Sequence, residues 1–107
     1  MPVVTDVKKS VKKQFELNGK IQPPKLYKVV YLNDDKTSAD FVVETLVIVF
    51  DYDRSRAMDI TQDIHVSGSA VVAVLPYEIA ETKGIEVTAL ARSHGFPLQV
   101  RLVPEDD

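Results

Sequence analysis

The chain has 107 residues, no cysteine and a formal net charge of −3 at pH 7. That length suits one domain with a modest core and is too short for two. The lack of cysteine excludes disulfides, thiol nucleophiles and cysteine-based zinc sites. No apolar run approaches the roughly 18 residues that a membrane helix needs, and no apolar stretch follows the N-terminal lysines as in a secretory signal. We therefore expect a cytoplasmic protein.

The charge is unevenly distributed along the chain. Residues 1–24 carry five lysines against Asp6 and Glu16, which gives +3, whereas residues 25–107 carry 8 basic and 14 acidic side chains, which gives −6. Nucleic acids bind to clustered lysine and arginine, and an acidic body repels their phosphates. A nucleic-acid partner is therefore not expected.

The N-terminal stretch "MPVVTDVKKSVKKQFELNGKIQPP" contains Gly19 and ends in Pro23 and Pro24, which interrupt regular structure. Three apolar residues at helical spacing would suit an amphipathic helix: Val7, Val11 and Phe15. A flexible tail is favoured, because the segment carries five lysines and has no evident partner face. We expect a flexible extension over residues 1–24 and a folded core over residues 25–107.

The first half of the core predicts one strand and two helices. "KLYKVVYLN" (25–33) is rich in β-branched and aromatic residues, which indicates a strand buried on much of both faces. Thr37 precedes Asp40 by three residues before an apolar run, a pattern close to a capping box. It predicts a helix there, although residues 47–50 alone would also suit a strand. Asp53 as an N-cap and Gly68 as a stop enclose a second helix.

The second half predicts a strand, a helix and a strand. "SAVVAVLP" (69–76) is a short strand, and the next segment has the Pro76 start and Gly95 stop that are usual for a helix. Gly84 inside that helix costs about 1 kcal/mol relative to alanine, which indicates that something needs the space. "FPLQVRLVP" (96–104) reads as the last strand. The order βααβαβ predicts a compact two-layer α+β domain, with three helices and a three-stranded antiparallel sheet.

Few residues suit chemistry. The only histidines are His65 and His94, and no serine occupies a nucleophile-elbow pattern. The oxygen-bearing residues near position 34 match no metal-binding loop: Asn33, Asp34, Asp35 and Asp40. Taken singly, Asp34 and Asp35 are ordinary turn residues and His65 an ordinary helix residue. We expect no metal, no cofactor and no catalysis.

Taken together, four segments resemble the ClpS family, the adaptors that deliver N-degron substrates to a Clp AAA+ protease. The segments are "PPKLYKVVYLNDDKTSADF", "DIHVSG", "EIAETK" and "ARSHGFPL". The resemblance runs from Pro23 to Val103, and the family has the same βααβαβ order. It implies two partners, an N-degron peptide or protein and the N-terminal domain of a Clp ATPase.

The resemblance also implies a site for the α-amino group of the substrate, formed by Asn33, Asp34, Asp35, Thr37 and His65. An α-amino group is mostly cationic at neutral pH and has three hydrogen atoms to donate. An amide oxygen, a carboxylate and a neutral imidazole nitrogen are suitable acceptors. On this interpretation, the two adjacent carboxylates after residue 33 are there to bind the positively charged α-amino group of a substrate.

His65 in that role predicts a pH dependence. A protonated imidazole cannot accept a hydrogen bond and repels an ammonium group, so binding should weaken as the pH falls through about 6. Peptide titrations between pH 5.5 and 7.5 measure this, and equal affinities across that range would contradict an acceptor role for His65.

A hydrophobic pocket for the first side chain of the substrate is implied by the same resemblance, with Ala39, Val42, Thr61, Ile64 and Leu98 as its lining. The family commonly has methionine at positions 39 and 61, so this chain has lost side-chain volume at both. Thr61 also adds a hydroxyl that needs a partner. These differences predict an altered preference: either β-branched isoleucine or valine is admitted, or the ranking among Leu, Phe, Tyr and Trp shifts.

A second surface, for docking on the Clp ATPase, is implied at Glu78, Thr82 and Lys83 of "YEIAETK". The N-terminal extension influences substrate handover in this family. We expect a monomer, because no long exposed apolar stripe requires self-association. The competing hypothesis is a protein-docking domain of the same topology that does not recognise free amines. An acid–base or metal enzyme using Asp34, Asp35 and His65 is disfavoured, because no nucleophile or oxyanion hole accompanies these residues.

Overall fold

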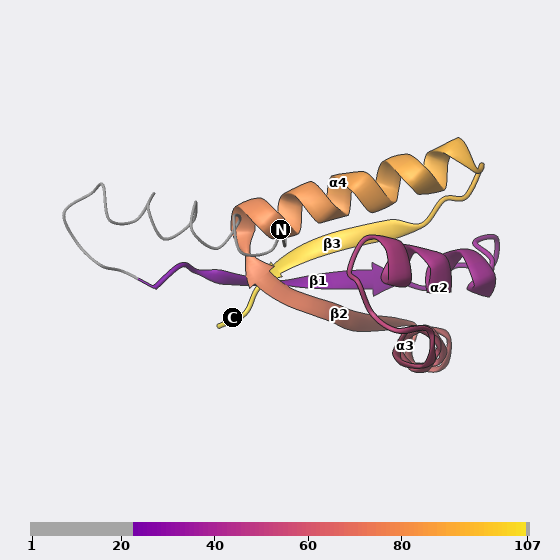
Figure 1. The fold of residues 1–107 in the computed structure, drawn as a ribbon, viewed down its shortest axis with the longest axis horizontal. Helices are drawn as coiled ribbons and strands as arrows, with labels where there is room; N and C mark the ends of the chain where they lie inside the picture. The colour runs from indigo at the N-terminus through magenta and orange to yellow at the C-terminus, as the bar shows by residue number, and fades with distance from the viewer. Residues whose placement is uncertain (1–22, 107) are drawn as a thin grey trace.

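A computed structural model describes residues 23–106 of this chain. Three strands and three helices follow one another in the order βααβαβ, which confirms the predicted α+β class (Figure 1). They are β1 (Leu26–Leu32), α2 (Ala39–Ile48), α3 (Arg54–Ser67), β2 (Ser69–Pro76), α4 (Tyr77–Ser93) and β3 (Gln99–Pro104). The predicted flexibility of residues 1–24 falls almost wholly outside the described residues.

The sheet is antiparallel, with β1 between β2 and β3. Along β1, Tyr31 lies opposite Ala70 of β2 and Val100 of β3. The β1–β2 register shifts between Val29 and Val30. Helix α4 runs along the strands, and α2 and α3 gather near the end of β1 (Figure 1).

The helices cover one face of the sheet. Val29 and Tyr31 have no exposed surface, and the Tyr31 hydroxyl lies 2.8 Å from Oγ1 of Thr45 on α2. On the opposite face of β1, Leu26 is 37% exposed and Val30 is only half-buried. The expectation that this strand is buried on much of both faces therefore holds fully for one face only, because the fold has two layers and the helices lie on one side of the sheet.

Helix α2 begins one residue later than its sequence pattern suggests. The N-cap is Ser38, whose Oγ accepts a hydrogen bond from the Phe41 amide at 3.2 Å, and not Thr37. Thr37 is instead held by Asp34, as described below. The helix ends at Ile48, so residues 47–50 do not form the alternative strand.

The predicted boundaries of α3 are confirmed. Asp53 caps the helix by accepting a hydrogen bond from the Arg56 amide at 2.7 Å. Gly68 ends the helix with a φ of 87°, a left-handed conformation that glycine adopts without the strain of a side chain.

Helix α4 starts after Pro76 and ends at Ser93, close to the predicted Gly95. Gly84 is buried where α4 passes close to β3: a Cβ built there would lie 3.6 Å from Cγ1 of Val100. That distance is ordinary van der Waals contact, so the close approach explains a small residue without forbidding alanine. None of the helices in residues 23–106 combines the length and the apolar character needed to cross a bilayer.

Candidate functional site

The acidic loop after β1 is folded around Asp34. Its Oδ1 accepts hydrogen bonds from the amides of Lys36, at 2.8 Å, and Thr37, at 2.6 Å. Its Oδ2 accepts from the Thr37 hydroxyl at 2.8 Å. Asp34 is therefore a turn-forming residue whose carboxylate is already occupied by its own loop.

The pKa of the Asp34 carboxyl reflects this arrangement. Partial burial acts to raise that pKa, but the hydrogen bonds from Thr37 and Lys36 outweigh burial and hold the pKa below its ordinary value. The positive charge of Arg92 lowers it further. Asp34 thus stays ionised at neutral pH as a fixed acceptor for the loop.

Asp35 differs from its neighbour. Its side chain is exposed and makes no hydrogen bond or ion pair with any residue in the range 23–106. The side chain of Asn33 is likewise exposed and without a hydrogen bond there. These two side chains are therefore available to an external donor.

The loop is connected to the end of α3. The amide of Asn33 donates to the carbonyl oxygen of Gly68 at 2.8 Å. His65 is exposed and lies three residues before Gly68, in the last turn of α3. The predicted acceptors Asn33 and Asp35 thus follow β1, and His65 lies near the end of α3. The hydrogen bond from Asn33 to Gly68 joins these two ends.

Apolar residues form the core beside these acceptors. Val42 of α2, Ile64 of α3 and Leu98 before β3 belong to one buried cluster. Thr61 is also buried, and its hydroxyl donates to the carbonyl oxygen of Ala57 at 2.7 Å. The partner that Thr61 was expected to need is therefore supplied by its own helix.

Ala39 is the one predicted pocket residue that is exposed. It is the first residue of α2, three residues before Val42, so both lie on the same side of the helix. Ala39 is therefore exposed at the start of α2, whereas the other four predicted pocket residues are buried.

Sequence reasoning did not identify Arg92, which holds the loop before β3. Its Nη1 donates to the carbonyl oxygens of Phe96, at 2.8 Å, and Leu98, at 3.1 Å. Phe96 also packs against Phe41 of α2, with ring centroids 5.0 Å apart. Arg92 thus fixes the backbone that carries Leu98, a role without any local sequence signal.

The residues expected to dock on the ATPase lie in the first half of α4 and do not all face the same way. The Thr82 hydroxyl donates to the Glu78 carbonyl oxygen at 2.9 Å, one turn away on the same side of the helix. Lys83 is half-buried, and its Nζ donates to the carbonyl oxygen of Val49 at 2.7 Å, with Phe50 beneath it. Lys83 therefore closes the C-terminal end of α2.

No three histidine, aspartate or glutamate side chains in the part of the chain described by the structure are grouped so that they could hold a metal ion. The acidic loop illustrates why. Asp34 turns inward to its own backbone while Asp35 is exposed, so the two carboxylates do not serve one centre.

Comparison with known proteins identifies the family. Residues 22–101 match the family model described as "ATP-dependent Clp protease adaptor protein ClpS". The ClpS adapter of Clostridium acetobutylicum is 42% identical over 97 residues, which cover 87% of this chain and 96% of that protein. The ClpS adapter of Nautilia profundicola is 50% identical over 76 residues, which cover 71% of this chain and 78% of that protein.

A solved structure agrees with these relatives. Agrobacterium tumefaciens ClpS2 bound to L-phenylalaninamide superposes with a TM-score of 0.75 at 44% identity, covering 78% of this chain and all of that one. The fold and the sequence therefore lead to the same family. This chain belongs to the ClpS family of Clp protease adaptors, and is an adaptor protein rather than an enzyme.

Proposed function

We propose that this protein binds substrates that begin with a free α-amino group and a bulky hydrophobic residue, and delivers them to a Clp AAA+ ATPase. The observation that carries the proposal is the position of exposed, unpaired acceptors beside an apolar cluster. L-phenylalaninamide, which its Agrobacterium relative binds, has a free α-amino group and an aromatic side chain on one carbon atom. A ligand of that kind requires both features side by side.

Asn33, Asp35 and His65 are the proposed direct acceptors for the α-amino group. Asp34 and Thr37 belong to the same site, but their role is to shape the loop, because their polar groups bond to each other. A hydrogen bond between charged groups contributes about 1.5–3 kcal/mol. Asp35 is the only unpaired carboxylate among the proposed acceptors, so it should dominate the charge-dependent part of binding.

Val42, Thr61, Ile64 and Leu98 are the proposed walls of the side-chain pocket, with Ala39 at its mouth. Burial of a leucine or phenylalanine side chain contributes about 1.5–3 kcal/mol. Three of these residues belong to the core of the domain, so their side chains are held in place before a ligand arrives and little ordering should be needed on binding.

Fluorescence anisotropy with labelled peptides that differ only in their first residue tests the proposal. Peptides that start with Leu, Phe, Tyr or Trp should bind, an Ala peptide should bind weakly, and N-acetylation of the Phe peptide should abolish binding. Equal or absent binding across this panel would favour the competing hypothesis, a ClpS-shaped docking domain that does not recognise N-degrons.

Ala39 is proposed to widen the entrance of the pocket, so that isoleucine and valine are accepted as first residues. Ala39→Met should reduce the affinity for Ile and Val peptides by about tenfold or more, since a methyl-sized clash or gap in a pocket is worth about 1–3 kcal/mol. Affinities for Phe and Leu peptides should change less. Anisotropy with the same panel measures the effect.

The control for this change is Ile48→Met, at an exposed site on the same helix. It should leave all affinities unchanged. If the unmodified protein already rejects Ile and Val peptides, an altered specificity through Ala39 and Thr61 is wrong even though N-degron binding itself stands.

Glu78 and Thr82 are proposed to contact the N-terminal domain of the ATPase. Lys83 belongs to the same proposed surface and attaches this part of α4 to the end of α2 through its bond to Val49. Residues 25–107 form the proposed adaptor core, and residues 1–24 the extension that influences handover. Binding to the isolated ATPase domain should fall on replacement of Glu78 in a chain that still binds peptides.

A further inference from the structure

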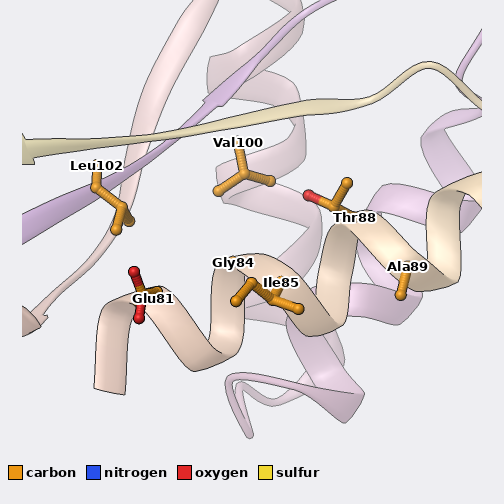
Figure 2. A pocket seen from close by; sticks show the side chains of 7 residues that line it. All are labelled: Glu81, Gly84, Ile85, Thr88, Ala89, Val100 and Leu102. Atoms are coloured by element: carbon orange, nitrogen blue, oxygen red, sulfur yellow. The ribbon is translucent and has the colours of Figure 1, made fainter. Parts of the chain in front are cut away.

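A groove of about 410 Å³ lies between α4 and β3 (Figure 2), and no residue of the acidic loop lines it. One side consists of Val100 and Leu102 of β3, and Gly84 leaves the space between them and the helix. The full lining is Glu81, Gly84, Ile85, Thr88, Ala89, Val100 and Leu102. Ile85 is 64% exposed, so an apolar side chain beside the groove lacks cover from residues 23–106.

The strand that borders this groove is an edge strand of the described sheet. The amide of Glu105 donates to the carbonyl oxygen of Leu26 at 3.0 Å. In an antiparallel pair, alternate residues direct their backbone groups to the partner strand. Arg101 and Val103 therefore bond to β1, whereas Val100 and Leu102 direct their N–H and C=O groups outward.

The groove beside α4 and the outward backbone groups of β3 together form a site suited to an extended peptide. A strand added at the outer edge would bond to the backbone of Val100 and Leu102. Side chains opposite those two residues lie on the same face of the sheet, which is the face of α4. They would therefore enter the groove, a combination that peptide-binding domains use in strand addition.

The sequence before residue 23 supplies a matching segment. Phe15 and Leu17 are two residues apart, so in an extended chain both would point to one side, together with Lys13 two residues before Phe15. Gln14 and Glu16 point to the other side. The spacing of Phe15 and Leu17 equals that of Val100 and Leu102.

Charge and reach favour this segment over an external peptide. Residues 1–24 carry +3 and residues 25–107 carry −6. Glu81, at the Leu102 end of the groove, accepts from the Tyr77 hydroxyl through Oε2 and keeps Oε1 for a cation. If the segment runs antiparallel to β3, Phe15 lies opposite Leu102, and Lys13 lies two residues further toward Glu81.

The connection back to β1 is long enough. Val100 is paired with Tyr31, which lies five residues from Leu26 along β1. A strand added outside β3 would be two strand spacings from β1, so its residue opposite Val100 would be about 20 Å from Leu26. Eight residues lie between Leu17 and Leu26, and the nine steps from one to the other span up to about 30 Å. Asn18 and Gly19 directly after Leu17 are suited to reversing the chain.

We propose that residues 13–17 of this chain dock as an added strand on the outer edge of β3, with Phe15 and Leu17 in the groove against α4. Docking covers the free edge of the sheet and holds the N-terminal extension to the core. The proposal does not depend on N-degron binding, since it uses neither the acidic loop nor the apolar cluster.

Amide hydrogen exchange of the full chain, followed residue by residue by NMR, tests the docking. The amides of Val100 and Leu102 should exchange on the order of tenfold more slowly in the unmodified chain than in Phe15→Ser/Leu17→Ser. The amides of Arg101 and Val103, which bond to β1, should not change and serve as an internal reference. Gln14→Ser/Glu16→Ser alters the opposite side of the segment and should retain the slow exchange.

Equal exchange at Val100 and Leu102 in all three chains would overturn the proposal. If that exchange is fast, the edge is unoccupied. If it is slow and slows further with protein concentration, a second copy of the chain covers the edge instead.

Discussion

Asp35→Ala is expected to weaken the binding of a peptide with N-terminal phenylalanine by about 10- to 150-fold, which corresponds to the loss of one charged hydrogen bond of about 1.5–3 kcal/mol. The stability of the domain should not change, because the Asp35 side chain makes no hydrogen bond or ion pair within residues 23–106. Peptide anisotropy gives the affinity and urea unfolding gives the stability. Against the N-acetylated peptide the substitution should have no further effect.

Asp34→Ala is the matched comparison, one residue away with the same loss of charge. It removes the acceptor of three hydrogen bonds within the loop, so the free energy of unfolding should fall by about 1–2 kcal/mol together with the affinity. Because the pKa of Asp34 is lowered in the folded protein, its contribution to stability is present above the ordinary carboxyl range and is lost as the pH falls through the lowered pKa. If Asp34→Ala lost affinity without any loss of stability while Asp35→Ala bound normally, the assigned roles would be reversed.

Lys83→Met is expected to lower the free energy of unfolding by about 1–3 kcal/mol, as measured by urea denaturation. Methionine keeps an apolar stem of similar length but cannot donate to the carbonyl oxygen of Val49, which then loses its partner at the end of α2. The contact of the ammonium group with the Phe50 ring, 5.6 Å from its centroid, is lost as well.

Lys36→Met is the control, because the Lys36 side chain is exposed and makes no hydrogen bond or ion pair with residues 23–106. Its effect should stay within about 0.5 kcal/mol. Equal effects of the two substitutions would show that Lys83 does not support α2. A weaker interaction with the ATPase caused by Lys83 replacement therefore has to be compared with the stability of the variant before it is assigned to docking.

The order of the elements was predictable because this sequence marks its boundaries with residues of special conformation. Asp53 and Gly68 each perform the local role that their residue type predicts, and the apolar spacing between them matches a helix. The start of α2 was misplaced by one residue. Thr37 and Ser38 are both suitable caps, and Thr37 is removed from that role by Asp34, which an isolated pattern does not reveal.

The site was only partly predictable from the residues themselves. Asp34 and Asp35 have the same side chain and adjacent positions, yet the turn directs one to the backbone and leaves the other exposed. The bond from Lys83 to Val49 spans 34 residues and has no periodicity that would reveal it. Val42, Ile64 and Leu98 were named as a pocket through the family resemblance, since three segments that meet only in the folded chain carry them.

We propose above that the acceptors near the acidic loop hold a free α-amino group. The most direct test is an NMR titration of the isotopically labelled chain with L-phenylalaninamide and, in parallel, with its N-acetylated form. We predict that the free amine shifts the resonances of Asn33, Asp35 and His65 and of residues around Leu98, with saturation, and that the acetylated compound leaves them unchanged. Equal responses to both compounds, or shifts confined to other parts of the domain, would contradict the account.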